Sequence, residues 1–154
     1  MLAYRAEIEI TGALGARTVP IDEFFTNFFT TALEHGEILT EIRIPIPPAR
    51  SGGCYLKVER KVGDYAAAAV AVQLSLSADG SIEQVGIGLT NVAVLPTRAT
   101  DAENVLRGQQ PSDALFIQAG QLAADASSPA DDLRGSAEYK LTPVSYTHLR
   151  AHET

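Results

Sequence analysis

The sequence predicts an α+β protein, in which an antiparallel sheet of three to four strands packs against helices that follow it in the chain. Between residues 54 and 89, three successive segments alternate apolar residues with small or polar ones, as half-buried strands do. Turn signals at Gly63-Asp64 and Asp79-Gly80 separate these segments. Residues 100–126 then carry helix caps and helical apolar spacing. Strands followed by helices are typical of this class.

The first part of the chain predicts a separate set of strands. Residues 6–11 alternate with Ala6, Ile8 and Ile10 on one face, and residues 16–19 are predicted to form the return strand after a turn flanked by two glycines. Residues 36–46 predict a third strand, which three prolines end. Its residues of one parity are Ile38, Thr40, Ile42, Ile44 and Ile46.

A short aromatic helix is expected between these strands. Asp22 is a plausible N-terminal cap, because aspartate side chains accept hydrogen bonds from the free backbone N–H groups of a first turn. The residues expected on this helix are Phe24, Phe25, Phe28 and Phe29.

The central segments are predicted as strands 55–62, 66–76 and 82–89, and Pro96 is expected to close the sheet. The alanines of residues 66–76 would also suit a helix, but the alternation of valines and leucines with small or polar residues favours a strand. Gly86 and Gly88 resemble a phosphate loop only superficially, and close backbone packing explains them better.

Three helices are predicted after the sheet. Thr100 or Asp101 can cap one that reaches Leu106, with Gly108 beyond its end. Ser112 or Asp113 can cap a second that runs to about residue 126. Its inward residues are predicted to be Leu115, Ala119 and Leu122. A third, residues 136–141, is expected to stop at Pro143.

Residues 143–154 lack any continuation of the apolar period. They resemble the peptide produced when a sequencing adapter or vector is translated in frame, so residues 142–154 are interpreted as a non-native tail. His148 and His152 in this tail have the spacing of one helical face but no third metal ligand, and His35 is read as a solvated loop residue. No metal site and no catalytic residue are predicted.

Charge and composition exclude several classes of partner. The formal net charge is −7, and no basic patch is visible, so nucleic acid and anionic membranes are unlikely partners. Cys54 is the only cysteine, so the chain can form neither an internal disulfide nor a thiolate cluster site. No apolar run approaches the roughly 20 residues that cross a bilayer. A cytoplasmic location is expected.

Four blocks of sequence, in this order, carry a family resemblance. They are residues 36–45 (GEILTEIRIP), 55–57 with 60–66 (YLK and RKVGDYA), 87–93 (IGLTNVA) with Pro96, and 134–139 (RGSAEY). They are similar to the C-terminal domain of the FAD-carrying medium subunit in the carbon monoxide dehydrogenase and xanthine dehydrogenase family of molybdenum hydroxylases. Residues 15–20 (GARTVP) with Phe24 and Phe25 resemble the end of that subunit's FAD-binding domain.

The resemblance implies a domain division and a function. Residues 1–48 would be the last strands of a truncated FAD-binding domain with a linker, and residues 49–141 the C-terminal domain. In this family a large subunit with a molybdenum cofactor passes electrons to 2Fe-2S clusters on a small subunit, and FAD on the medium subunit passes them to an acceptor. The glycine-rich loops that bind the FAD pyrophosphate are not found in this sequence, so the chain is expected to be truncated at both ends and to retain FAD weakly or not at all.

By resemblance, Leu39, Lys57, Asp64 and Tyr65 fall at or near positions that face the flavin. Leu39 could instead cap a small core, and Lys57 could be a solvated strand lysine rather than a charge that stabilises an anionic reduced ring. Asp64 after a glycine is also ordinary turn chemistry. Tyr65 can stack on a flat ligand, with core packing as its main competitor.

Two other function classes stay open at this point. One is a non-catalytic subunit-docking module that keeps the domain but binds no flavin. The other is an unrelated stand-alone enzyme, although no nucleophile-elbow motif such as G-x-S-x-G occurs. The substrate of the complex cannot be read from these residues.

Overall fold

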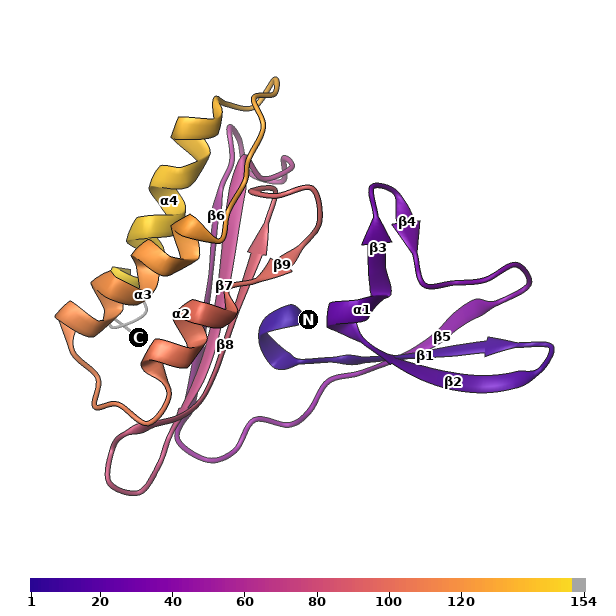
Figure 1. Ribbon diagram of the computed structural model, residues 1–154, viewed down its shortest axis with the longest axis horizontal. Coiled ribbons are helices and arrows are strands. Elements are labelled where there is room, and N and C mark those ends of the chain that lie inside the picture. Colours follow the sequence, from indigo (N-terminus) through magenta and orange to yellow (C-terminus); the bar gives the residue numbers. More distant parts are fainter. Residues whose placement is uncertain (151–154) are drawn as a thin grey trace.

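The computed structural model describes the backbone of residues 1–150 and the side chains of residues 1–144. An N-terminal unit precedes a larger C-terminal domain (Figure 1). The N-terminal unit contains the 3-10 helix η1 (Leu2–Tyr4), β1 (Glu7–Gly12), β2 (Gly15–Pro20), α1 (Ile21–Phe24), β3 (Phe25–Asn27), β4 (Thr30–Thr31) and β5 (Ile38–Arg43). The C-terminal domain contains β6 (Ser51–Val58), β7 (Ala68–Leu76), β8 (Ile82–Thr90), β9 (Thr97–Arg98), α2 (Thr100–Leu106), α3 (Asp113–Asp125) and α4 (Ala137–Arg150).

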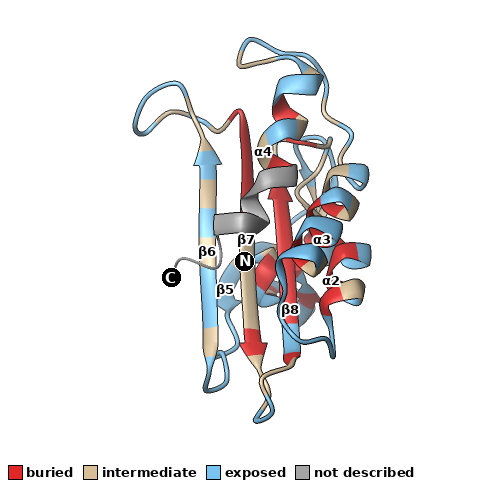
Figure 2. Cartoon of the chain, turned by 90° about the vertical axis from the view of Figure 1, so that its left-hand side faces the viewer, coloured by how far each residue is buried: buried red, intermediate tan, exposed pale blue. Residues whose placement is uncertain are grey.

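The C-terminal domain is an antiparallel sheet in the order β6-β7-β8-β9, with the helices packed on one face (Figure 1). The predicted α+β class is therefore confirmed. The connection between β7 and β8 turns at Gly80, whose φ of 88° is the left-handed conformation that glycine adopts readily. Coloured by burial, β7 and β8 are the buried strands while β6 is largely exposed along an edge (Figure 2).

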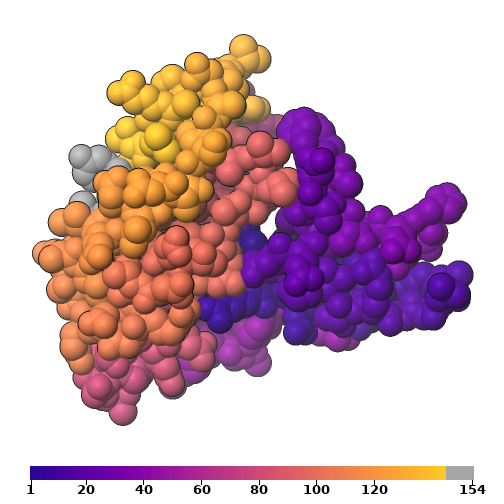
Figure 3. Space-filling model, viewed as in Figure 1, coloured from indigo at the N-terminus to yellow at the C-terminus, as the bar shows by residue number. Residues whose placement is uncertain are grey.

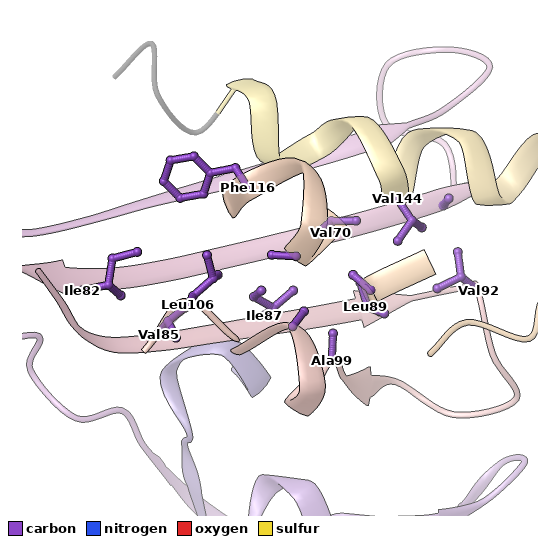
Figure 4. Close-up of a cluster of buried hydrophobic side chains, with 14 residues drawn as sticks. Val70, Ile82, Val85, Ile87, Leu89, Val92, Ala99, Leu106, Phe116 and Val144 are labelled. Carbon is purple, nitrogen blue, oxygen red and sulfur yellow. The ribbon is translucent and has the colours of Figure 1, made fainter. Parts of the chain in front are cut away.

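The main core lies between this sheet and the helices (Figure 4). Val85, Ile87 and Leu89 are buried at every second position of β8, and they meet Phe116 of α3. Each such side chain contributes about 1.5–3 kcal/mol when it leaves water. Because consecutive strand residues face opposite sides, the intervening Gly86 and Gly88 point to the other face of the sheet.

The N-terminal unit has its own smaller core and its own sheet, in the order β2-β1-β5. The buried residues are Ala6, Ile8, Ile10, Val19, Ile21 and Phe24. The isoleucines of β5 and the segment after it lie on the uncovered side, and Ile46 is 93% exposed. The alternation in residues 36–46 thus predicted the strand correctly, although the observed strand ends at Arg43, before the prolines.

The predicted aromatic helix is wrong beyond its first turn. Helix α1 ends at Phe24, and the chain then forms the short β3–β4 hairpin, which carries Phe28 and Phe29 exposed at its tip. Phe29 has a φ of 52°, which an α-helix cannot contain. Asp22 lies inside α1 and caps nothing; its carboxylate instead pairs with Arg98 of β9 at 2.7 Å.

Two other local predictions are wrong. Pro96 does not close the sheet, because β9 follows it and pairs with the end of β8. Helix α2 begins after Ala99 without a side-chain cap, so neither Thr100 nor Asp101 acts as its cap. The cap predicted at Ser112 is confirmed, since its Oγ accepts a hydrogen bond from Leu115 N at 3.3 Å.

Helix α4 does not stop at Pro143. It runs from Ala137 to Arg150, with the proline inside it. A proline in a helix interior costs about 3 kcal/mol, because it removes one hydrogen bond and crowds the preceding turn. Val144, only 2% exposed in the main core, offsets part of that cost, and α4 packs along α3 and β7. His148 and His152 lie outside the residues whose side chains are described.

The two units meet on the face of the sheet opposite to the helices, where η1 lies across β8. A Cβ atom added to Gly86 would lie 2.0 Å from the carbonyl oxygen of Ala3, and one added to Gly88 would lie 3.1 Å from Leu2 Cβ. The expectation of close backbone packing at these two glycines is confirmed.

A buried ion network makes the second contact between the units. Glu103 of α2 is 1% exposed, and its Oε1 accepts hydrogen bonds from Ile87 N at 2.9 Å and from Arg98 Nε at 3.0 Å. Arg98 reaches on to Asp22, and Arg5 lies 3.6 Å from Glu103 Oε2. The hydrogen bond with Glu103 is the main cause that raises the pKa of Arg98 above its ordinary value. Among the described residues, no helix is long and apolar enough to cross a membrane.

We predict that Gly86→Ala destabilises the chain by about 1–3 kcal/mol, because the new methyl group must displace the backbone of η1. Urea unfolding measures the change. Gly52→Ala on β6 is the matched control, since nothing lies within 4 Å of its added Cβ, and its effect should stay within about 0.5 kcal/mol. Equal effects of the two substitutions would show that η1 does not dock on β8.

We predict that Glu103→Gln lowers the free energy of unfolding by about 3–5 kcal/mol, because Arg98 loses its buried counter-charge and keeps only the more exposed Asp22. Arg107→Gln is the control, because it removes a weaker ion pair of the same carboxylate. Arg107 is 42% exposed and lies 3.9 Å from Glu103 Oε2, so its loss should change the free energy of unfolding by less than about 1 kcal/mol. Similar losses in both variants would contradict the assignment of Glu103 to a structural network centred on Arg98.

Candidate functional site

Three of the four residues that the sequence predicted for the flavin site lie together: Asp64 and Tyr65 in the connection between β6 and β7, and Lys57 near the end of β6. Gly63 turns the chain with a φ of 84°, and Asp64 N donates to Lys61 O at 3.1 Å. The Asp64 carboxylate then accepts a hydrogen bond from Tyr65 N at 2.9 Å. It also accepts one from Arg60 Nε at 3.3 Å. Asp64 therefore stabilises the turn that presents Tyr65, which is the usual role of an aspartate in a turn.

Lys57 supports the same turn. Its Nζ pairs with Glu59 Oε2 at 2.5 Å and donates to the carbonyl oxygen of Asp64 at 3.1 Å. The hydrogen bond with Glu59 is the main cause that raises the pKa of Lys57. The Lys57 charge is therefore largely neutralised by Glu59 beside it.

Tyr65 stands at a cleft of about 380 Å³ between the two units. Its side chain is 78% exposed, so core packing does not explain it. The cleft is lined by Phe29, Tyr65, Ala66, Thr90, Asn91 and Arg134. Asn91 adopts the left-handed conformation, with a φ of 62°, and its Nδ2 donates to Ala66 O at 2.8 Å and Ala67 O at 3.0 Å. These two hydrogen bonds to backbone carbonyl oxygens fix the Asn91 side chain in the wall of the cleft.

Arg134 covers the ring of Tyr65. Its Cζ atom lies 5.2 Å from the ring centroid, within the range of a cation–π contact. The Nε atom of Arg134 is buried and has no hydrogen-bond partner among the described residues. The cleft thus contains an aromatic face, a guanidinium and a buried N–H group with no acceptor.

A second cleft of about 420 Å³ shares the lining residue Phe29, at the tip of the hairpin, with the first. It is lined by Phe25, Asn27, Phe28, Phe29, Thr30, Thr31, Val94, Leu95 and Pro96. Phe29 is 95% exposed, and its ring centroid lies 4.3 Å from that of Phe28. In the space-filling view the hairpin stands against the C-terminal domain at this junction (Figure 3).

Leu39, the fourth predicted residue, is not brought to either cleft. It lies opposite Ile10 in the N-terminal sheet and packs, half-buried, on the N-terminal core. The structure thus contains the alternative contact, in which Leu39 covers a small core. A contact of Leu39 with a flavin stays a prediction.

Comparisons with known proteins identify the family of the chain. Residues 53–153 match the family model described as CO dehydrogenase flavoprotein C-terminal domain. The chain belongs to this family. Residues 1–47 match a second family model, described as FAD binding domain in molybdopterin dehydrogenase. As expected from the four sequence blocks, the resemblance is to medium subunits of molybdenum hydroxylases.

Individual members of the CO dehydrogenase flavoprotein family cover nearly the whole chain. The carbon monoxide dehydrogenase medium chain of Afipia carboxidovorans is 45% identical over 96% of this chain and 51% of its own length. The nicotine 6-hydroxylase medium subunit of Paenarthrobacter nicotinovorans is 36% identical over 91% of this chain and 48% of its own.

A crystal structure of the Cu,Mo-CO dehydrogenase in its cyanide-inactivated form superposes with a TM-score of 0.92 at 42% identity, covering 99% of this chain and 53% of that chain. The chain therefore spans about half the length of the relatives it matches.

Of the six residues that line the cleft, sequence reasoning assigned only Tyr65 to the site. Asn91 and Arg134 stood inside the blocks that carried the resemblance, but nothing in their spacing gave them a role. Phe29 was assigned to a helix that does not form. No group of three or more histidine, cysteine or acidic residues that could hold a metal is present in the described part of the chain.

The loop that carries Arg134 is held by a buried lysine. Lys140 of α4 is 2% exposed, and its Nζ pairs with Asp132 Oδ2 at 2.7 Å and donates to Ala130 O at 2.8 Å. Asp132 Oδ1 accepts from Arg134 N at 2.8 Å. The hydrogen bond with Lys140 is the main cause that lowers the pKa of Asp132 below its ordinary value of 3.8.

We predict that Asp132→Asn lowers the melting temperature at pH 7, because Lys140 loses its counter-charge. A carboxylate with a lowered pKa stabilises the fold above its ordinary pKa of 3.8 and loses that contribution as the pH falls through the folded value. The gap between wild type and variant should therefore shrink below about pH 3.8. Melting curves from pH 7 to pH 2 measure it. Asp131→Asn, which keeps an oxygen for Ala137 N, is the control and should lose less at pH 7.

Proposed function

We propose that this chain forms the isoalloxazine-facing part of an FAD subunit, which passes electrons from iron–sulfur clusters through FAD to an acceptor in a molybdenum hydroxylase of the carbon monoxide dehydrogenase type. The observation that carries the proposal is the cleft at the junction of the two units, where the Tyr65 side chain is largely exposed. A volume of about 380 Å³ lies within the range of small-molecule sites.

The residues present suit a flat, polar-edged ring. Exposed Tyr65 and Phe29 offer aromatic faces, which favour stacked or edge contacts with another ring system. Arg134 lines the cleft, and a guanidinium donates hydrogen bonds that ring nitrogens or carbonyl oxygens of a ligand can accept. FAD, when bound, supplies the electron-transfer chemistry, and the protein supplies its position and electrostatics.

Each predicted residue then has a defined task. Tyr65 covers the ring and limits access to it. Asp64 and Lys57 hold the turn that presents Tyr65: Tyr65 N donates to the Asp64 carboxylate, and Lys57 Nζ donates to the carbonyl oxygen of Asp64. Leu39 packs on the N-terminal core, on which Phe25 at the start of the hairpin also packs.

The partners proposed for this subunit are a small subunit with 2Fe-2S clusters and a large subunit with the molybdenum cofactor. We place the junction between the FAD-binding part and the C-terminal domain at residues 48 and 49. Relatives named after carbon monoxide, nicotine and glyceraldehyde all match this chain, so we propose that the substrate is selected outside it.

The proposal is tested in a joined protein, in which this chain replaces the segment of the Afipia carboxidovorans medium chain that it matches. We predict that the joined protein purifies with close to one FAD per chain. Tyr65→Ala should remove about 1 kcal/mol of ring contact, which is about a fivefold loss of FAD affinity, and should shift the flavin potential. Flavin absorbance after gel filtration and a redox titration measure both.

Tyr55→Ala is the matched control, because Tyr55 is an exposed tyrosine of β6 outside both clefts. It should leave FAD content and potential unchanged. A folded joined protein without flavin would reject the proposal in favour of a subunit-docking module. Unfolding by Tyr65→Ala, with unchanged flavin in the surviving protein, would make Tyr65 a structural aromatic instead.

A further inference from the structure

The cations around the cleft differ in how far their charges are already compensated. Lys57 is paired with Glu59 at 2.5 Å, and Arg60 lies 3.3 Å from the carboxylate of Asp64. Among the described residues, no carboxylate forms an ion pair with Arg134, and its buried Nε has no hydrogen-bond acceptor. Among the described residues that line the cleft, Arg134 alone carries a positive charge, and no ion pair compensates it.

The backbone position of Arg134 is fixed by hydrogen bonds within its loop. Asp132 Oδ1 accepts hydrogen bonds from the backbone N–H groups of Arg134, at 2.8 Å, and Gly135, at 3.2 Å. The other oxygen of Asp132 is held by Lys140 inside the domain. The guanidinium then rests over the ring of Tyr65, 5.2 Å from its centroid. Two elements far apart in sequence meet at this contact.

We infer that Arg134 is a positioning residue of the candidate site: its guanidinium holds the Tyr65 ring at the cleft and gives the cleft a positive potential, so that the site favours a flat aromatic ligand with negative charge. Only the identity of the ligand depends on the proposed function, and under that function the ligand is the reduced flavin ring. The Arg134–Tyr65 contact and the potential are properties of this chain alone.

The chain contains no tryptophan, so Tyr65→Trp introduces a single indole at the cleft. Its fluorescence is quenched with iodide, an anion, and with acrylamide, which is neutral, at constant ionic strength of about 0.1 M, where charges 5 Å apart still interact. The ratio of the two quenching constants reports the local potential. Adding Arg134→Met should lower this ratio two- to fourfold, the size expected for one unit charge about 5 Å from the quencher in water.

Lys61→Met is the matched control, because it removes one positive charge from the same turn without a contact to the ring; it should leave the ratio within error. Arg134→Lys should restore most of the ratio, and Arg134→Gln serves as a second neutral variant if Arg134→Met does not fold. A ratio unchanged in a folded neutral variant, or lowered equally by Lys61→Met, overturns the inference. Because no flavin is used, a joined protein that lacks FAD would reject the proposed function and leave this result standing.

Discussion

The buried carboxylate of Glu103 is the contact on which the arrangement of the two units depends. It binds a backbone N–H of β8 and the guanidinium of Arg98, which reaches on to Asp22 in the N-terminal unit. A charge removed from water is tolerated only when it is paired and hydrogen-bonded, so alternatives that separate these groups are strongly disfavoured. One carboxylate thereby links sheet, helix and N-terminal unit.

The cleft follows from this docking. Its wall residues come from the hairpin of the N-terminal unit, the β6–β7 turn, the end of β8 and the loop before α4. The close approach of Ala3 to Gly86 sets how near the N-terminal unit lies to the sheet. Neither unit has the whole cleft, so a change that loosens the docking is expected to enlarge the cleft before it unfolds either core.

The strands of the C-terminal domain could be predicted because large apolar side chains face the helices at every second position, while small or polar residues face the other side, which gives the period of two. Gly86 and Gly88 were also correctly interpreted. Asp22 and Pro143 were not, because local signals are overridden by long-range contacts: a residue with the chemistry of a cap is used in an ion pair, and a helix breaker is tolerated where Val144 is buried. Phe29, strained at positive φ, follows from no local pattern at all.

The residues of the candidate site also divide into those that local sequence could predict and those that it could not. The turn around Asp64 is made by neighbours in sequence. Even the pairing of the Lys57 charge with Glu59 could have been anticipated, since Glu59 lies two residues further and therefore on the same face of an extended chain. Arg134 comes from another element, and no spacing connects it to Tyr65. The aromatic ring and the positive charge of the cleft thus have separate supports. A change in the loop held by Lys140 can therefore alter the charge at the cleft while the turn that presents the ring keeps its hydrogen bonds.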